Sequence, residues 1–129
     1  MNTHGVMLNP NGIFQIMKLY GIPNCSTVKK ARVWLTEHGI DVSFHDIKKQ
    51  GISEELLNSW LKQVGREKLV NTRGTTWRQL SDDARAAASD NAGAVRLMLE
   101  KPSVIKRPIL EKDDTITLGF DEAVYQTLF

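Results

Sequence analysis

Apolar and polar residues alternate in two short segments, and a segment with helical periodicity separates them. Residues 17–21 predict a short first strand, and residues 42–47 alternate well enough to predict a second. Between them, over about residues 25–38, apolar side chains recur at the spacing of one helix face, and Gly39 ends the pattern. A strand, a helix and a second strand in this order form a βαβ unit, so the two strands should be parallel.

Residues 52–101 have a helical pattern along nearly their whole length. Ser53 is a favourable N-cap for the first helix, and Ser81 and Asp90 are suitable caps for two later ones. Residues 67–71 predict a short helical turn between them. No Gly-, Ser- or Pro-rich linker flanks this block, so we interpret it as an insertion into a β-rich domain rather than as a domain of its own.

The last part of the chain predicts a β-hairpin and a helix. Residues 105–110 and 115–118 are β-favouring runs about a polar turn at residues 112–114, and Asp121 can cap a final short helix. The complete order is βαβ, then helices, then ββα. We therefore expect an α/β fold with a thioredoxin-like βαβ…ββα core and an all-helical insertion at about residues 52–101.

Composition adds little that is unusual. The chain has 129 residues, of which 41% are hydrophobic and 25% charged, as in one globular domain. Residues 1–16 are polar and turn-rich, and we expect a flexible N-terminal extension there, before a domain of residues 17–129. The net charge of +2, with Lys and Arg spread along the chain, does not indicate a nucleic-acid partner. Since neither a membrane-spanning run nor a signal peptide is evident, we expect a cytoplasmic protein. We also expect it to be a monomer.

Chemistry is concentrated at Cys25, the only cysteine of the chain. It lies at the predicted start of the first helix, where unpaired N–H groups and the helix dipole favour a thiolate, and Lys29 and Lys30 follow within one turn. Although a lone cysteine is often a buried apolar residue, the order of strand, Pro-containing turn, Cys and helix indicates a reactive thiol. One cysteine forms no internal disulfide, and without His and Cys clusters we expect no metal.

Two arginines lie in segments that suit an anion site. Arg73 occurs in residues 71–78, NTRGTTWR, where Gly and hydroxyl side chains surround a guanidinium. Arg107 precedes Pro108 at the start of a predicted strand. Within a sheet, proline is tolerated only at the first residue of a strand, on an edge strand or at a bulge. From the residues alone, a structural role is favoured over a functional one for both arginines, with Arg73 solvated or paired with a surface carboxylate in a capped loop.

The motifs at these positions resemble those of the arsenate reductase-related family, which includes the glutaredoxin-linked ArsC enzymes, the Spx regulators and the YffB proteins. The resemblance is greatest to the YffB branch and covers about residues 17–129. It rests on LYGIPNC at residues 19–25, LVNTRGTTW at 69–77, and IKRPIL at 105–110 followed by LGF at 118–120. It implies a thioredoxin-like core with a helical insertion, with Cys25 as the nucleophile.

The resemblance also implies roles for individual residues. Arsenate reductases surround the cysteine with three arginines, and Arg73 and Arg107 match two of them; at the third position residues 118–121 read LGFD, so arsenate reduction itself stays open. The Arg107–Pro108 bond is expected to be cis and to face the cysteine. The expected contacts of the thiolate or of a bound glutathione are Asn24, Ser26, Thr27 and Pro108.

These implications favour a glutathione-dependent, single-cysteine thiol reductase, with glutathione as co-substrate, glutaredoxin as a candidate partner and a small oxyanion or a disulfide as substrate. One alternative is a regulator that binds RNA polymerase, as Spx proteins do. Because Val28 stands where a Cys-x-x-Cys pair would have its second cysteine, an intramolecular disulfide switch is excluded. The other alternative is a protein that binds glutathione without turnover.

Overall fold

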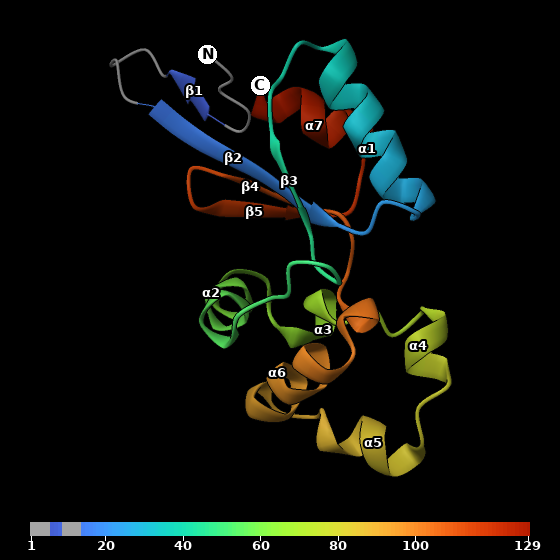
Figure 1. Ribbon diagram of the computed structural model, residues 1–129. Coiled ribbons are helices and arrows are strands. Elements are labelled where there is room, and N and C mark those ends of the chain that lie inside the picture. The colour runs from blue at the N-terminus through green and yellow to red at the C-terminus, as the bar shows by residue number, and fades with distance from the viewer. Residues whose placement is uncertain (1–5, 9–13) are drawn as a thin grey trace. The chain divides into compact units, whose positions relative to one another are not determined.

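The computed structural model describes residues 6–8 and 14–129. The chain forms two compact units, which Figure 1 shows in one view. The first consists of the chain up to Asp46 together with Arg107–Phe129, and the second is the continuous segment Ile47–Lys106. The first unit contains the strands and two helices, whereas the second is helical.

A mixed sheet forms the centre of the first unit. Strand β3 (Ser43–Asp46) lies parallel to β2 (Phe14–Gly21). Strand β4 (Ile109–Lys112) lies antiparallel to β2, and β5 (Thr115–Leu118) is antiparallel to β4. The parallel pair confirms the predicted βαβ unit, and the whole arrangement confirms an α/β fold with a thioredoxin-like core.

A further strand, β1 (Val6–Leu8), pairs antiparallel with the beginning of β2. The sequence predicted a flexible extension over residues 1–16 and a strand from residue 17, whereas β2 already begins at Phe14. Residues 1–5 and 9–13 lie outside the described residues, so the extension is described only in these two strands. The sequence analysis missed β1 and the beginning of β2 because each is a short apolar run. They form strands because they pair with each other, and neither is long enough to be recognised alone.

Two helices pack on one face of this sheet and enclose its core. Helix α1 (Ser26–Glu37) contributes Trp34, and α7 (Glu122–Leu128) contributes Tyr125, whose rings meet edge to face at 5.5 Å. Beneath them lie Leu19 of β2 and Leu110 of β4, which face each other in the ladder and are fully buried. The apolar periodicity of the sequence thus places α1 directly over the central strand, next to the loop that carries Cys25 (Figure 1).

The hairpin of β4 and β5 turns at Asp113 and Asp114, whose φ angles of 53° and 63° are both positive. A two-residue turn of this hand matches the twist of the flanking strands, and Asp tolerates the left-handed region better than most residues. The predicted first strand of residues 105–110 is shorter in the structure, because Ile105 forms an isolated bridge with Val70 instead and β4 begins only after Pro108.

The second unit contains five helices and one 3₁₀ turn within the described chain. They are α2 (Glu54–Val64), α3 (Arg66–Leu69), α4 (Thr75–Arg78), α5 (Asp82–Ala87), α6 (Asn91–Glu100) and the 3₁₀ turn Pro102–Val104. The predicted caps are confirmed, since the side chains of Ser53, Ser81 and Asp90 each accept a hydrogen bond from a backbone N–H of the first turn.

Helix α4 was not predicted. Its sequence, TTWR, has weak helix propensity, and no side chain caps its N-terminus. Its last carbonyls are instead bound from the next helix, where the Arg85 guanidinium donates hydrogen bonds to the carbonyl oxygens of Trp77 and Arg78 at 3.2 and 2.6 Å. A contact from outside the segment therefore stabilises a turn that local sequence disfavours.

Candidate functional site

Cys25 lies in the turn that joins β2 to α1. Its backbone N–H donates to the carbonyl oxygen of Ile22 at 3.1 Å, which closes a tight turn through Pro23 and Asn24. Cys25 is the N-cap residue of α1, with extended backbone angles, and its carbonyl accepts the first helical hydrogen bond from Lys29 at 3.0 Å. The cysteine thus stands at the helix N-terminus that the sequence predicted, with a free and partly buried thiol.

The thiol receives hydrogen bonds from the first turn of α1 and from Arg107. Burial, the largest single influence, raises the pKa of Cys25, but the backbone N–H of Val28, a hydrogen bond from Arg107, the backbone N–H of Thr27 and the positive charge of Arg107 together lower it below its ordinary value. Donors that point at a thiolate favour the charged form, as does a nearby cation. The geometry therefore suits a thiol that reacts as a nucleophile.

A close approach of β2 and α1 fixes the position of this turn. At Gly21, the last residue of β2, an added Cβ would lie 2.8 Å from Cγ2 of Val28. Val28 is itself fully buried against the sheet, so it has little room to move. Glycine at position 21 consequently permits the helix N-terminus to lie against the end of the strand, and the N–H groups of Thr27 and Val28 to reach the thiol.

Arg107 and Pro108 belong to the same unit as Cys25. Arg107 is partly buried, Pro108 is buried, and the peptide bond between them is cis, as predicted from the resemblance. The carbonyl oxygen of Pro108 accepts a hydrogen bond from the N–H of Gly119 at 2.8 Å. Residues 118–121, where arsenate reductases carry a third arginine, are thereby held beside Pro108, with Leu118, Gly119 and Phe120 in place of a cation.

The other predicted contacts of the thiolate divide into two groups. Thr27 reaches the thiol through its backbone N–H, and Val28, which the sequence analysis did not include, does the same. Asn24 and Ser26 are exposed, and none of the hydrogen bonds within the described chain joins either side chain to Cys25. Backbone donors have no residue signature, so only the position of Cys25 at a helix start could have indicated Val28.

Arg73 lies in the second unit, in a turn that its neighbours stabilise. The Asn71 side chain accepts a hydrogen bond from the backbone N–H of Arg73 at 3.2 Å, and the backbone carbonyl of Asn71 accepts one from the N–H of Gly74 at 3.3 Å. The N–H of Asn71 in turn donates to Val104 at 2.6 Å. Hydrogen bonds thus hold the backbone on both sides of Arg73 while its side chain is exposed, and its role at the cysteine stays a prediction.

Within residues 6–8 and 14–129, no three side chains of His, Cys, Asp or Glu are grouped as ligands of a metal ion. Over the same residues, no helix combines the length and the apolar character needed to cross a bilayer.

The chain is similar to a known protein family and to solved structures of that family. The model of the ArsC family matches residues 20–128. The YFFB protein is 43% identical with a TM-score of 0.82, over 86% of this chain and 96% of its own. An arsenate reductase (ArsC) related protein from Brucella melitensis is 50% identical with a TM-score of 0.70, over 86% and 92%. The global transcriptional regulator Spx of Streptococcus pyogenes is 29% identical over 83% of this chain and 80% of its own.

Proposed function

The chain belongs to the ArsC family, and from this we propose that it is a glutathione-dependent thiol reductase with Cys25 as its nucleophile. The observation that carries the proposal is the lowered pKa of Cys25, which the hydrogen bonds from Val28, Arg107 and Thr27 and the charge of Arg107 produce against the effect of burial. A lowered pKa increases the share of thiolate, and the thiolate is the reagent that thiol–disulfide exchange requires.

The proposed reaction reduces a glutathionylated thiol in two exchange steps. The Cys25 thiolate attacks the glutathione sulfur of the mixed disulfide, so that a Cys25–glutathione disulfide forms and the substrate leaves as a thiolate, which takes up a proton. The thiolate of a second glutathione then attacks the glutathione sulfur on Cys25. This step releases oxidised glutathione and restores the Cys25 thiolate. External glutathione is needed because the chain has no second cysteine.

Arg107 supplies the positive charge of this mechanism. Its hydrogen bond to the thiol favours the thiolate at rest, and its guanidinium is suited to a carboxylate of glutathione or to an oxyanion. We propose Arg73 as a second anion contact. Asn24, Ser26, Thr27 and Pro108 are the proposed neighbours of the bound glutathione, whose supply makes the cytoplasm the fitting compartment.

Arsenate is a second substrate to test, because the Brucella melitensis relative is an arsenate reductase (ArsC) related protein. In that reaction Cys25 would hold an arsenic–sulfur adduct, which glutathione or glutaredoxin would resolve. The segment at residues 118–121 lacks the third arginine of the arsenate reductases. We therefore expect disulfide exchange to be the faster of the two activities.

The competing function is transcriptional regulation, which the similarity to Spx of Streptococcus pyogenes favours. Spx is named a global transcriptional regulator, and its likeness extends over most of both chains. A regulator would keep the fold and would show no turnover with either substrate. The two functions are therefore separated by a single assay of catalysis.

The test is NADPH consumption in the presence of glutathione and glutathione reductase, with arsenate or a glutathionylated peptide as substrate and with glutaredoxin added in a parallel series. We expect turnover of the peptide, and its complete loss in Cys25→Ser, because a serine hydroxyl is not ionised near neutral pH. Thr36→Ala is the matched control, since it removes an exposed hydroxyl group from the same helix, outside the proposed site, and leaves the thiol in place. Absence of turnover with both substrates would contradict the proposal.

In that case, calorimetric titration with glutathione distinguishes the remaining alternatives. Binding that depends on Cys25 or Arg107, without turnover, identifies a non-catalytic glutathione-binding protein. Absence of binding leaves the regulatory function as the better explanation of the similarity to Spx.

A further inference from the structure

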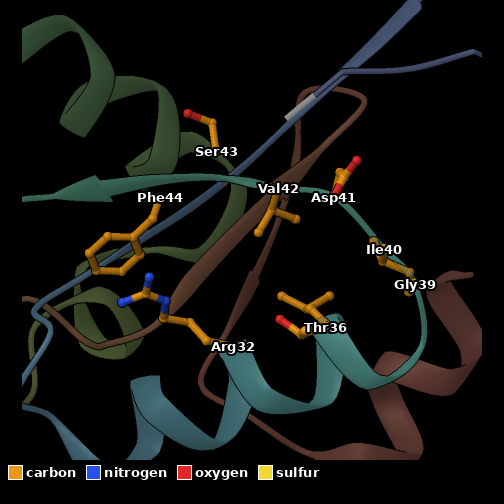
Figure 2. A pocket seen from close by; sticks show the side chains of 9 residues that line it. Arg32, Thr36, Gly39, Ile40, Asp41, Val42, Ser43 and Phe44 are labelled. Carbon is orange, nitrogen blue, oxygen red and sulfur yellow. The ribbon is translucent and has the colours of Figure 1, made fainter. Parts of the chain in front are cut away.

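Two pockets on α1 differ in how they relate to the candidate site. The pocket in Figure 2, of about 550 Å³, is lined by Arg32, Thr36 and the segment from Gly39 to Phe44, which follows the C-terminal end of α1. None of these residues acts on the pKa of the Cys25 thiol. The other pocket begins nearer the N-terminus of α1, at Lys29, whose backbone N–H donates to the carbonyl oxygen of Cys25. This second pocket therefore adjoins the reactive turn.

The wall opposite α1 is also connected to the site. Phe120 and Glu122 form this wall, and we call the cavity the Phe120 pocket. Phe120 follows Gly119, whose N–H donates to the carbonyl oxygen of Pro108 at 2.8 Å. Pro108 in turn follows Arg107, which hydrogen-bonds to the thiol. Since both walls begin at residues that hydrogen bonds tie to the site, the Phe120 pocket continues the site along the helix.

An exposed stripe on α1 leads from the reactive turn into the pocket. Its members recur at spacings of four, three and four residues, which puts them on one face of the helix. They are Ser26, Lys30, Val33 and Glu37. The distance along the helix axis from Cys25 to Val33 is about 12 Å. An extended peptide covers that distance in about three to four residues.

The Phe120 pocket presents apolar surface to solvent. Its volume is about 380 Å³, at the lower end of the range for small-ligand sites. Val33 is 54% exposed, and the side chains of Trp34 and Phe120 line the pocket beside it. An apolar group that enters the pocket removes this surface, together with its own, from water.

The charged side chains around the pocket balance one another. Two lysines lie on α1 near the reactive turn, and two glutamates lie further along α1 and at the start of α7; they are Lys29, Lys30, Glu37 and Glu122. Their formal charges sum to zero, so the pocket as a whole selects neither an anion nor a cation. The apolar surface is what distinguishes one ligand from another.

We propose that the Phe120 pocket receives an apolar side chain of the polypeptide whose glutathionylated cysteine is reduced at Cys25. This inference rests on the proposed function and names its substrate class. The substrates are mixed disulfides of glutathione with proteins that carry a large apolar residue about three or four positions from the cysteine. An open pocket holds a free apolar molecule weakly, whereas a side chain tethered to the reacting cysteine binds at a high effective concentration.

Two glutathionylated peptides test the pocket in the NADPH-coupled assay. One is Phe-Gly-Gly-Cys-Gly-Gly-Phe, which offers an apolar side chain in either chain direction, and the other has Ser in place of both Phe residues. We expect kcat/KM to be about tenfold higher for the Phe peptide, at the low end of the discrimination that hydrophobic pockets of enzymes reach.

Val33→Ser is the decisive variant, and Val124→Ser is its matched control. Both residues are exposed helix valines of the first unit, at 54% and 42% exposure, but Val124 does not line the pocket. We expect Val33→Ser to reduce the preference for the Phe peptide to about threefold, and Val124→Ser to leave it at about tenfold. Phe120 is less suitable for replacement, because its ring packs edge to face on Tyr125 at 4.9 Å.

An NMR titration of the ¹⁵N-labelled Cys25→Ser chain measures binding without reaction. The Phe peptide should shift the amide signals of Lys30, Val33 and Phe120 and the indole N–H signal of Trp34. That indole N–H is buried and has no acceptor within the described chain, so its signal responds to a ring or a carbonyl brought into the pocket. The Ser peptide should leave these signals near their free positions.

The outcomes separate this inference from the function on which it rests. Equal kcat/KM for the two peptides, or an equal loss of preference in both valine variants, would overturn the pocket and leave the thiol reductase intact. If neither peptide were turned over, the proposed function would fail, and the titration would decide about the pocket by itself. Shifts at the pocket signals would then retain it as a site for polypeptides, and their absence would overturn it.

Discussion

The segments that carry Arg107 and Arg73 are alike in sequence terms and different in structure. Each places an arginine next to a residue with a special backbone role, Pro108 in one and Gly74 in the other. Arg107 is partly buried and hydrogen-bonds to the Cys25 thiol, where its charge helps to lower the pKa. Arg73 is exposed, and the hydrogen bonds of its turn join backbone groups and the Asn71 side chain.

The difference shows that the environment of an arginine, rather than its motif, decides its chemical effect. A guanidinium within hydrogen-bond distance of a thiolate acts at short range and in a partly desolvated setting. An exposed guanidinium is screened by water and by salt, and it acts mainly on ligands that approach it. Arg107 should therefore control the thiol itself, whereas Arg73 should matter chiefly when an anionic substrate is bound.

Replacing each arginine by alanine gives the largest effect we expect. Arg107→Ala should raise the pKa of Cys25, because one hydrogen bond and one nearby positive charge are lost. We expect kcat/KM for the glutathionylated peptide to fall about a hundredfold, in the range seen when one donor to a reacting anion is removed. Arg73→Ala should also raise the pKa, but less, and should act mainly through KM. The rate of iodoacetamide alkylation against pH measures the pKa directly.

Arg107→Lys is the control for charge, since it retains a cation and loses the planar fork. It should recover part of the alkylation rate at neutral pH. Identical alkylation profiles for Arg107→Ala, Arg73→Ala and the unchanged chain would show that neither arginine acts on the thiol, and the comparison between the two segments would then fail.

The sequence predicted well those parts of the fold that local patterns determine. The periodicity of residues 25–38 gave α1, and side-chain caps such as Ser53 and Asp121 marked helix starts that the structure confirms. It failed where partners far along the chain decide the structure. Strand β1 depends on pairing with β2, and α4 depends on hydrogen bonds from Arg85.

The residues of the candidate site also differ in how far the sequence could predict them. Cys25 could be identified because a unique cysteine at a helix start has a clear physical meaning. The donors at Val28 and Thr27 are backbone groups, so side-chain types reveal them only after the helix start is fixed. The motif of Arg73 predicted a residue role, but exposure and the surrounding turn are properties of the folded chain.

Substitution of a glycine near each arginine-bearing or cysteine-bearing turn tests whether local packing controls the Cys25 thiol. In Gly21→Ala, the added methyl group would lie 2.8 Å from Val28 and would push α1 away from β2. We expect the free energy of unfolding to fall by about 2 kcal/mol, as for overpacking elsewhere. Cys25 alkylation should also slow, because the N–H groups of Thr27 and Val28 move with the helix. Urea denaturation and alkylation rates measure the two effects.

Gly74→Ala is the counterpart in the segment of Arg73. The added Cβ would lie 2.9 Å from Nδ2 of Asn71, the end of a side chain, and would weaken the hydrogen bond that the N–H of Arg73 donates to Oδ1 of Asn71. We expect a loss of about 1 kcal/mol and an unchanged alkylation rate at Cys25. If Gly74→Ala slowed alkylation as much as Gly21→Ala, the thiol would not be controlled locally.

The smallest effect we expect is a pH dependence of stability that arises from Cys25. Its pKa is lowered in the folded chain, because the hydrogen bonds from Val28, Arg107 and Thr27 and the charge of Arg107 outweigh burial. Between the folded pKa and the unfolded value of about 8.5, the unfolded chain binds more protons than the folded one. Stability from this group should therefore be complete above the unfolded pKa and should be lost as the pH falls through the folded pKa.

The measurement is the difference in free energy of unfolding between the unchanged chain and Cys25→Ser, taken at several pH values in the presence of a reductant. Only the titration of Cys25 differs between the two, so other ionisable groups cancel to first order. The difference should rise with pH between the folded pKa and the unfolded one, and become level above the unfolded pKa of about 8.5. In an Arg107→Ala background the rise should be smaller, and in Arg73→Ala it should persist. A flat difference in the unchanged chain would mean that the fold does not favour the thiolate, and Arg107 would then have no more influence on Cys25 than Arg73 has.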